Sequence, residues 1–396
     1  MGFVIDKCDC GASGSMSNHM KVIHIIIGMD KGGAEKMLRR LIEINLMAGT
    51  ESNHSLISLT NIGFHGSFLR AKGVDVNVLN IRGPLSLVAG FSKLLSMLKK
   101  NPPHIVQTWM VHSDLLGGLA ARLTGVPRVI WGVRTTDFSV ESRSTRAVRW
   151  LCARLSFFVP DKIVCAAQAS LQSSAHAGYD FSKLMVIPNG FDLADLRAHV
   201  GSGATIRQQC GFDSNHVVVG CLGRYNPAKD HANFVRAAGL LAARFDECRF
   251  LMVGRDLKRS NLELMEQIQA TGFANRFVLL GERDDPASCL DAMDVFALSS
   301  CTEGFPNVLG EAMAMGVPCV STNVGDAAVL LGNTGPVVPA RDADALAAAM
   351  ALWVQMPRAE RQAFGRKAQE RVQSQFSLDT AAQQFNDLYK ELMAKA

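Results

Sequence analysis

The sequence lacks any run of about 18 uncharged apolar residues, the length that a helix needs to cross a membrane. Its start also lacks the basic segment, apolar segment and cleavage site that mark a signal peptide. Its ten cysteines are scattered, without the paired spacing of zinc ligands. These absences predict a cytoplasmic protein with reduced cysteines, no zinc site and no membrane span.

Two ligand-binding motifs are missing as well. No Gly-x-Gly-x-x-Gly string follows the first predicted strand, which argues against a nicotinamide cofactor. No Asp-x-Asp string lies in a loop suited to holding a metal ion. We therefore expect a protein that uses neither a metal ion nor another cofactor.

The length of the chain favours two domains. Its 396 residues exceed the size at which one hydrophobic core stops growing, about 250 to 300 residues. Apolar residues make up 48% and charged residues 19%, which is a globular composition. Residues 1–20, rich in Gly, Ser and Cys, show no periodicity, and we predict that they form a disordered leader.

The positive charge is concentrated in the first half. Residues 1–190 carry 21 Lys and Arg against 12 Asp and Glu, whereas the remainder carries 20 against 24. This excess suggests an anionic partner, either a membrane surface or a phosphorylated acceptor. No nucleic-acid-binding motif accompanies it, and we expect no nucleic acid partner.

Short apolar runs alternate with helical patterns along both halves, which predicts an α/β fold with two Rossmann-like sheets. In the first half the runs are 21–27, 55–59, 74–79, 104–108, 128–133 and 162–165. In the second half they are 216–222, 249–254, 276–280, 295–298, 316–321 and 335–338. A turn at Asn189-Gly190 and the polar residues after it form a linker between the halves.

The stretch 299–325 carries two glutamates, Glu303 and Glu311. A strand ends just before Glu303, and Pro306 begins a helix in which Glu311 lies about one turn from the start. The free amides of that helix start favour an anion, and Gly304 lets the backbone approach a ligand closely. Carboxylates are poor phosphate ligands but good acceptors for hydroxyl groups. The pattern therefore predicts a ligand with phosphate in the middle and hydroxyls at both ends, as in a nucleotide sugar.

Two cations follow the first strand of the second half. Arg224 comes shortly after the strand 216–222, and Lys229 lies five residues later, just before a predicted helix. The guanidinium fork and the ammonium point charge together suit the two phosphates of a diphosphate. We predict that both bind the diphosphate and neutralise it as a leaving group.

The first strand runs into a glycine-rich loop, 28–35, that contains Gly32 and Gly33 and leads into a helix. A strand, a glycine loop and a helix start form the phosphate-binding unit of many doubly wound domains. The loop therefore predicts a second contact to the ligand's phosphates.

The residues from Glu303 to Glu311 resemble the E-x7-E signature of the family 4 retaining glycosyltransferases, which have the GT-B fold. In that family the first glutamate contacts the donor sugar and the second the nucleotide ribose, and the resemblance implies these roles here. It also implies that main-chain groups line the donor sugar and diphosphate at Gly304, Phe305, Asn307 and Val308.

The resemblance extends over nearly the whole chain after residue 20. It implies that the amides of Gly32 and Gly33 face the donor phosphates. It also implies that His112, at the carboxyl edge of the first sheet, contacts the donor sugar. Main-chain groups at Gly281 would hold the nucleotide base.

Basic residues occur in the family at the positions of Arg224 and Lys229, whereas Val329 stands near a place where many relatives have a glutamate. The resemblance implies two Rossmann-like domains facing across a cleft and a last helix that returns to the first domain. The expected boundaries are 21–190 for the acceptor-side domain, 191–372 for the donor-binding domain and 373–396 for the returning helix.

Two segments of the first half are candidates for acceptor or membrane contacts. Arg134 and Thr135 follow a strand end, and we predict that they line the acceptor site. The segment Arg143 to Phe158 reads as a helix with arginines on one side and bulky apolar residues on the other. This pattern suits an anionic membrane surface, but we favour the alternative, an ordinary helix packed on its own domain.

The motifs and the resemblance together predict a metal-independent, retaining transferase. It would move a hexosyl group from a nucleoside-diphosphate sugar, for which we favour UDP, to a glycan or lipid-linked glycan in surface polysaccharide biosynthesis. It would work in the cytoplasm, at the inner face of the membrane where it binds lipid. Two alternatives are a nucleotide-sugar epimerase, which needs no acceptor, and a non-catalytic nucleotide-sugar-binding protein.

Overall fold

The computed structural model of the chain describes residues 20–30, 32–49, 52–136, 138 and 142–395. The predicted leader lies outside the described residues, except for its last residue. Met20 is the first residue of strand β1 and not part of a leader. It extends the strand because it pairs with Ser52 of the neighbouring strand β2.

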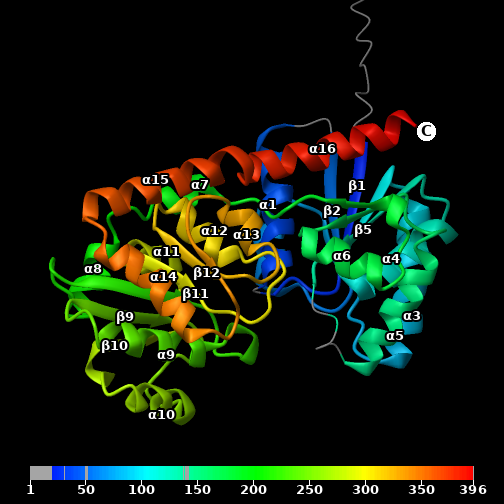
Figure 1. The fold of residues 1–396 in the computed structure, drawn as a ribbon. Coiled ribbons are helices and arrows are strands. Elements are labelled where there is room, and N and C mark those ends of the chain that lie inside the picture. Colours follow the sequence, from blue (N-terminus) through cyan, green and yellow to red (C-terminus); the bar gives the residue numbers. More distant parts are fainter. Residues whose placement is uncertain (1–19, 31, 50–51, 137, 139–141, 396) are drawn as a thin grey trace, which may run out of the picture.

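Two fully parallel sheets form the framework (Figure 1). The first has the order β3-β2-β1-β4-β5-β6-β7, with β1 Met20–Ile26, β2 Ser52–Ser58, β3 Val76–Val78, β4 Ile105–Trp109, β5 Arg128–Val133, β6 Lys162–Cys165 and β7 Leu184–Val186. The second has the order β10-β9-β8-β11-β12-β13, with β8 Val217–Leu222, β9 Cys248–Val253, β10 Phe277–Gly281, β11 Val295–Leu298, β12 Cys319–Thr322 and β13 Val337–Val338.

The helices lie between the strands along the chain. Those between the strands of the first sheet are α1 Gly33–Met47, α2 Gly63–Ala71, α3 Pro84–Lys100, α4 Val111–Leu123, α5 Arg143–Leu155 and α6 Gln168–His176, with the short 3-10 turn η1 Phe181–Lys183. The helices that follow are α7 Leu193–Arg197, α8 Gly203–Gln209, η2 Pro227–Lys229, α9 His231–Ala242, α10 Leu262–Ala270, η3 Ala274–Arg276, α11 Pro286–Asp291, α12 Asn307–Ala314, α13 Ala327–Leu331, α14 Ala343–Gln355, α15 Arg358–Gln375 and α16 Leu378–Ala394.

Each sheet is buried on both faces, which explains its nearly continuous apolar strands. In the first sheet, Ile105 and Trp109 of β4 pack with α1 and α16, whereas Val106 packs on the other face with α3, α4 and α5. The second sheet is covered by α8, α11, α12 and α15 on one face and by α9, α10 and α14 on the other. We call the first sheet with α1–α6 the first lobe and the second sheet with α7–α15 the second lobe.

The last helix leaves the second lobe and packs on the first. Figure 1 shows α15 and α16 running along one side of the molecule, from the second lobe onto the first. Phe385 and Tyr389 of α16 are fully buried in the core of the first lobe, and Tyr389 donates to Gln107 of β4. The Arg128 Nε–H donates to the carbonyl of Leu392 at 2.8 Å. These contacts confirm the predicted returning helix, and with the two sheets they confirm the predicted fold.

The chain crosses between the lobes twice, and the two crossings bond to each other. Phe191 of the linker donates its amide to Phe376 at 2.9 Å and accepts from the Leu378 amide at 2.9 Å. Ser377, between α15 and α16, pairs with Phe191 in an isolated bridge and caps α16. The linker and the returning helix therefore form one junction.

One helix starts earlier than the sequence predicts. The sequence predicts a loop after residue 108 and a helix from Leu115, whereas β4 ends at Trp109 and α4 begins at Val111. The whole connection is Met110, whose positive φ of 71° turns the chain sharply. A non-glycine residue seldom adopts this conformation, so residue type gave no signal for it.

Candidate active site

A cavity of about 580 Å³ lies between the two lobes. It is lined from the first lobe by the start of α1 and the loop after β5, and from the second lobe by Arg224 and the loop before α12. The lining residues are Gly33, Ala34, Glu35, Met110, Arg134, Thr135, Thr136, Ala166, Asn189, Arg224, Thr302, Glu303, Gly304, Phe305 and Asn307. The carboxyl edges of parallel strands contribute from both lobes, which is where α/β proteins bind ligands.

Glu303 is held by two neighbours at the strand-end loop after β11. Lys229 Nζ lies 2.6 Å from Glu303 Oε1, and the Ser300 hydroxyl donates to the same oxygen at 2.6 Å. Lys229 comes from η2, which Asn226 caps by accepting from the Ala228 amide. Two loops that are 74 residues apart in the chain thus place a carboxylate and an ammonium group together.

Glu311 makes an ion pair across the two lobes. Its Oε1 lies 2.8 Å from Lys36 Nζ, and Lys36 belongs to α1 of the first lobe. The pair is partly shielded, with side-chain exposures of 39% for Lys36 and 16% for Glu311. Sequence reasoning missed Lys36, because nothing in its local pattern shows that it faces a residue 275 positions away.

The glycine positions make the cavity narrow. A Cβ at Gly33 would lie 3.1 Å from Asn307 Nδ2, and one at Gly304 would lie 2.6 Å from Thr136 Oγ1. At Gly32, the N-cap of α1, a Cβ would collide with the Glu35 carboxylate. At Gly33 and Gly304 the two walls therefore lie so close together that a larger residue would have to displace the side chain facing it.

Around the start of α12 the side chains of Phe305 and Val308 are buried, whereas Asn307 lines the cavity. Phe305 is 8% exposed and packs on Phe191 and Phe376, at ring distances of 5.9 and 6.0 Å. Val308 is also buried in the second-lobe core. The first amides of a helix have no intrahelical acceptor, so those at Asn307 and Val308 remain for a ligand.

Six predicted site residues are not among those that line the cavity: Gly32, Lys229, His112, Gly281, Val308 and Glu311. His112 lies in the first turn of α4, and Met110 is the residue of that connection that lines the cavity. Gly281 ends β10 with a φ of 67°, and its carbonyl accepts from the Gly254 amide at 2.7 Å. Neither is among the lining residues given above.

The predicted acceptor residues are brought to the first-lobe wall. Thr135 lines the cavity, and its hydroxyl accepts from Arg149 Nη2 at 3.0 Å. Arg149 is 5% exposed and also stacks on Phe138. This corrects the predicted amphipathic segment, in which Arg149 counted among the outward-facing arginines. It points inward because Thr135 and the Phe138 ring form its contacts there.

Arg134 has an unusual environment. Its guanidinium stacks over Trp109 at 4.3 Å and donates to Asn189 Oδ1 at 3.3 Å. Burial lowers the pKa of Arg134 to about 10, so it stays charged at neutral pH. Burial also raises the pKa of Glu35, which lines the same cavity.

Asp326 makes a further cross-lobe contact that the sequence did not reveal. Its carboxylate accepts from the amides of Gln168 and Ala169 at 2.7 and 2.9 Å, and so caps α6 of the first lobe. Its own amide donates to the Gly304 carbonyl at 2.9 Å. Asp326 thus joins the cavity wall of the second lobe to a first-lobe helix.

Val329 stands near a place where many relatives have a glutamate. It lies in α13, the helix that follows Asp326, and is 46% exposed.

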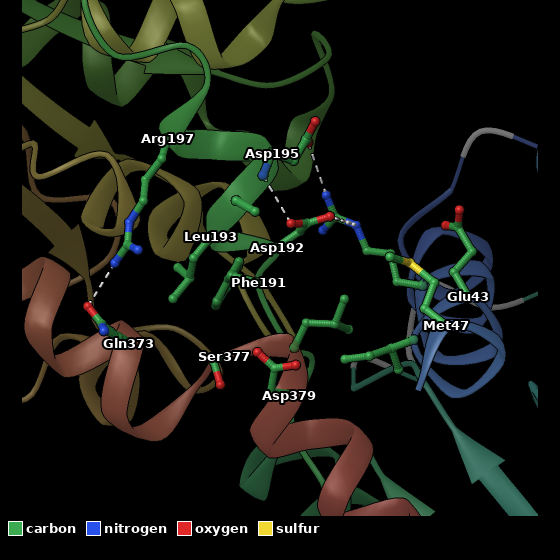
Figure 2. A pocket seen from close by; sticks show the side chains of 14 residues that line it. Glu43, Met47, Phe191, Asp192, Leu193, Asp195, Arg197, Gln373, Ser377 and Asp379 are labelled. Atoms are coloured by element: carbon green, nitrogen blue, oxygen red, sulfur yellow. Dashed lines mark hydrogen bonds and ion pairs between the residues drawn. The ribbon is translucent and has the colours of Figure 1, made fainter. Parts of the chain in front are cut away.

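A second cavity, of about 660 Å³, lies at the junction of the linker, α1 and the α15–α16 turn (Figure 2). Arg40 of α1, 5% exposed, lies 3.4 Å from Asp195 and 4.0 Å from Asp192. Arg197 donates to Gln373 at 2.8 Å. No predicted site residue lines this cavity, and its contacts tie the linker to α1 and α15.

Family comparisons agree with this geometry. The sequence profile described as Glycosyltransferase Family 4 matches residues 51–195, and the profile described as Glycosyl transferases group 1 matches residues 216–355. Together they cover more than half of the chain. The chain is a family 4 glycosyltransferase of the GT-B type.

Individual relatives are moderately similar to this glycosyltransferase. It is 30% identical over 258 residues to UDP-Gal:alpha-D-GlcNAc-diphosphoundecaprenol alpha-1,3-galactosyltransferase of Escherichia coli, over 63% of this chain and 66% of that enzyme. It is 23% identical to the capsular polysaccharide biosynthesis glycosyltransferase CapM of Staphylococcus aureus, over 83% of this chain and 93% of CapM.

Solved structures share its fold. HepE of Anabaena in complex with UDP matches with a TM-score of 0.81 and 22% identity, over 94% of this chain and 100% of HepE. WaaG, a glycosyltransferase involved in lipopolysaccharide biosynthesis, matches with a TM-score of 0.70 and 14% identity, over 93% and 99%. These matches confirm the predicted GT-B fold.

Within the described part of the chain, no helix is both long and apolar enough to cross a membrane. The same residues contain no group of three or more His, Cys, Asp or Glu side chains arranged to hold a metal ion.

Proposed function

We propose that this glycosyltransferase moves a hexosyl group from a UDP-sugar to a hydroxyl of a lipid-linked or glycan acceptor, with retention of configuration. One observation carries the proposal. The interlobe cavity collects Glu303, Arg224 and the start of α1, and Lys229 holds Glu303 in place. The names of its relatives support the substrate class, because the E. coli enzyme uses UDP-Gal and a diphosphoundecaprenol acceptor and CapM acts in capsule biosynthesis.

The donor would bind with its diphosphate near Arg224 and Lys229. The amides at the starts of α1 and α12 add partial positive charge on either side. Glu303 would accept hydrogen bonds from the sugar hydroxyls, and Glu311 from the ribose. Main-chain groups at Gly281 and the side chain of His112 would complete the donor contacts after a shift, because neither lines the cavity in this arrangement.

The reaction would break the bond between the anomeric carbon and the diphosphate oxygen and form a bond from that carbon to the acceptor hydroxyl. The hydroxyl proton would pass to a leaving-phosphate oxygen, because attack comes from the side of the leaving group. Two cations and the helix-start amides can stabilise the departing diphosphate without a metal ion. Each such donor typically contributes about 3 kcal/mol in the transition state.

Each lobe would bind one of the two substrates. Residues 21–190 would bind the acceptor, residues 191–372 the donor, and residues 373–396 would connect the second lobe back to the first. On α5 and just past its end, Trp150 is 62% and Phe158 is 80% exposed, and the exposed Arg154 lies over the Trp150 ring. Apolar and basic groups together would let the first lobe rest on an anionic membrane, which suits a cytoplasmic enzyme with a lipid-linked acceptor in surface polysaccharide biosynthesis.

The proposal is tested by a donor screen followed by product analysis. Thermal unfolding with a panel of UDP-, GDP- and ADP-sugars should single out UDP-sugars, since a ligand at 100 times its Kd adds about 2.7 kcal/mol. Proton NMR of the product made from an α-linked donor should show an α linkage. A β-linked product would overturn retention. An altered donor in reactions without acceptor would indicate an epimerase.

A further inference from the structure

Among the described residues, none forms an ion pair with the Arg134 guanidinium. Its Nη1 has the bond to Asn189 described above, whereas its Nε and Nη2 are shielded from solvent and lack hydrogen-bond partners. Among the described residues, no carboxylate lies within 4.0 Å of its guanidinium nitrogens. A charge in such surroundings is costly unless it is paired.

Asp114 is the carboxyl group whose charge acts on Arg134, and it is a weak partner. Asp114 attracts Arg134, but burial raises the pKa of Asp114 to about 7, and this carboxyl is therefore only partly ionised at neutral pH. Asp114 already accepts hydrogen bonds from the Thr108 hydroxyl at 2.6 Å and from the Gly132 amide at 3.1 Å. It serves the connection between β4, α4 and β5, and it leaves the Arg134 fork without a bidentate partner.

Arg134 is also a residue of the cavity wall. Arg134 lines the interlobe cavity together with Thr136, whose hydroxyl also lacks a partner and is shielded from solvent. Both follow β5 in the first lobe, opposite the wall that carries Arg224. A planar guanidinium fork with a nearby hydroxyl is suited to a phosphoryl group, which offers several acceptor oxygens.

We propose that Arg134, assisted by Thr136, binds a phosphoryl group of the acceptor, so that the acceptor is a sugar carried on a phosphate or diphosphate. The inference rests on the proposed function. The donor diphosphate has its own cations in Arg224 and Lys229 of the second lobe. Arg134 lies on the other wall, in the half of the chain with the excess of Lys and Arg. A second anion site facing the donor site matches a second phosphorylated substrate.

The same chemistry has another source, the donor's own phosphates, and a calorimetric experiment separates the two. The full-length protein is first saturated with UDP and then titrated with inorganic pyrophosphate. Wild type should bind pyrophosphate in the presence of UDP. Arg134→Gln should weaken pyrophosphate binding at least about tenfold, the loss expected for a hydrogen-bonded charge, and leave the Kd of UDP within about twofold.

Three variants keep the result interpretable. Arg134→Lys retains the charge without the fork and should fall between wild type and Arg134→Gln. Thr136→Val should weaken pyrophosphate binding without removing any charge. Arg146→Gln removes an exposed arginine of α5 and should leave both affinities unchanged. Unfolding temperatures identify any variant that fails to fold.

Two results would overturn the proposal. One is that UDP-saturated wild type does not bind pyrophosphate. The other is that Arg134→Gln weakens UDP itself, which would assign Arg134 to the donor. A wild-type protein that binds no UDP at all would instead contradict the proposed function.

Discussion

Lys229 and Glu303 each restrain the other beside the cavity, and we propose that this pairing prepares both for a donor. The ammonium group fixes the Glu303 carboxylate at 2.6 Å, which suits a group that accepts hydrogen bonds from sugar hydroxyls. Lys229 retains further donor capacity, because an ammonium group has three hydrogens. The same lysine can therefore hold the glutamate and contact a phosphate.

Replacing Lys229 with methionine should reduce kcat by about 100-fold or more, because one preformed donor to the leaving group is lost. The unfolding temperature should change little, since a partly exposed ion pair contributes at most about 1 kcal/mol. Steady-state kinetics with the best UDP-sugar measure the effect. Lys258→Met, in an exposed pair with Asp256 of the same lobe, is the matched control and should behave as wild type. An unchanged kcat in Lys229→Met would remove the lysine from the mechanism.

The residues of the site differ in how far the sequence predicts them. Glu303, Lys229 and Gly33 stand in short motifs next to strand ends, so strand and helix patterns alone place them at a sheet edge. The sequence did not predict Lys36 or Asp326 as site residues, because their partners, Glu311 and the start of α6, come from the other lobe. Such contacts depend on how the lobes dock, and one sequence holds no local signal for docking.

Among the secondary-structure elements, helix α1 of the first lobe contacts both the second lobe and the linker. On this helix, Gly33 lines the cavity, Lys36 pairs with Glu311, and Arg40 contacts Asp195 of the linker. These positions are three and four residues apart, so they lie along one face of the helix. Donor binding at Glu311 would therefore be coupled to the position of α1.

Lys36→Met should raise the KM for the UDP-sugar by up to about fivefold with little change in kcat, because the pair holds α1 beside Glu311 and is worth at most about 1 kcal/mol. Since part of the pair is exposed, the difference from wild type should shrink in 1 M salt. Kinetics at two salt concentrations test this. Lys72→Met breaks a Lys–Glu pair within the first lobe and should leave KM unchanged. A KM equal to wild type in Lys36→Met would contradict the coupling.

The strands β1, β2 and β4 share a buried imidazole pair. Trp109 donates to His24 Nδ1 at 3.2 Å, so His24 carries its proton on Nε2 and donates to His54 Nδ1 at 2.9 Å. Burial lowers the pKa of His54 to about 4 and that of His24 well below its usual value. Both rings are therefore neutral in the folded protein at pH 7.

Folding stability should fall as the pH drops from about 6.5 to about 4. The unfolded chain binds a proton at each histidine near pH 6.5, whereas the folded chain resists it, so acid favours unfolding. For His54 the loss is on the order of 3 kcal/mol. Urea unfolding of wild type and His54→Gln at pH 7.5 and pH 4.5 isolates this contribution from that of His231, whose pKa burial also lowers to about 4. Equal pH dependence in both proteins would refute it.

At the scale of the whole molecule, two parallel sheets face each other and a returning helix connects them. The sequence predicts this architecture well, because strands such as β5, β6 and β11 are buried apolar runs between helical patterns. It predicts boundaries less well, as for α4, where the positive φ of Met110 decides the helix start. It does not predict the inward turn of Arg149, because the contacts of Arg149 come from the loop after β5.

The exposed end of the first lobe provides a test at this scale. Phe157→Asp with Phe158→Asp should abolish co-sedimentation with vesicles of anionic phospholipid, because two exposed aromatic rings are replaced by negative charge. Turnover of a water-soluble acceptor should be retained. Leu262→Asp, which changes an equally exposed apolar residue on the second lobe, should sediment as wild type does. Unaltered sedimentation of the double variant would exclude this surface as the membrane contact.

Calorimetric titration of UDP and of uridine into wild type and Arg224→Gln measures the diphosphate site directly. Arg224 is exposed in the cavity, so its replacement should leave the fold intact. We predict that UDP binds wild type more tightly than uridine does. In Arg224→Gln, UDP should weaken by at least about tenfold while uridine is unaffected. Equal affinities of the two proteins for UDP would contradict a diphosphate held between the two lobes.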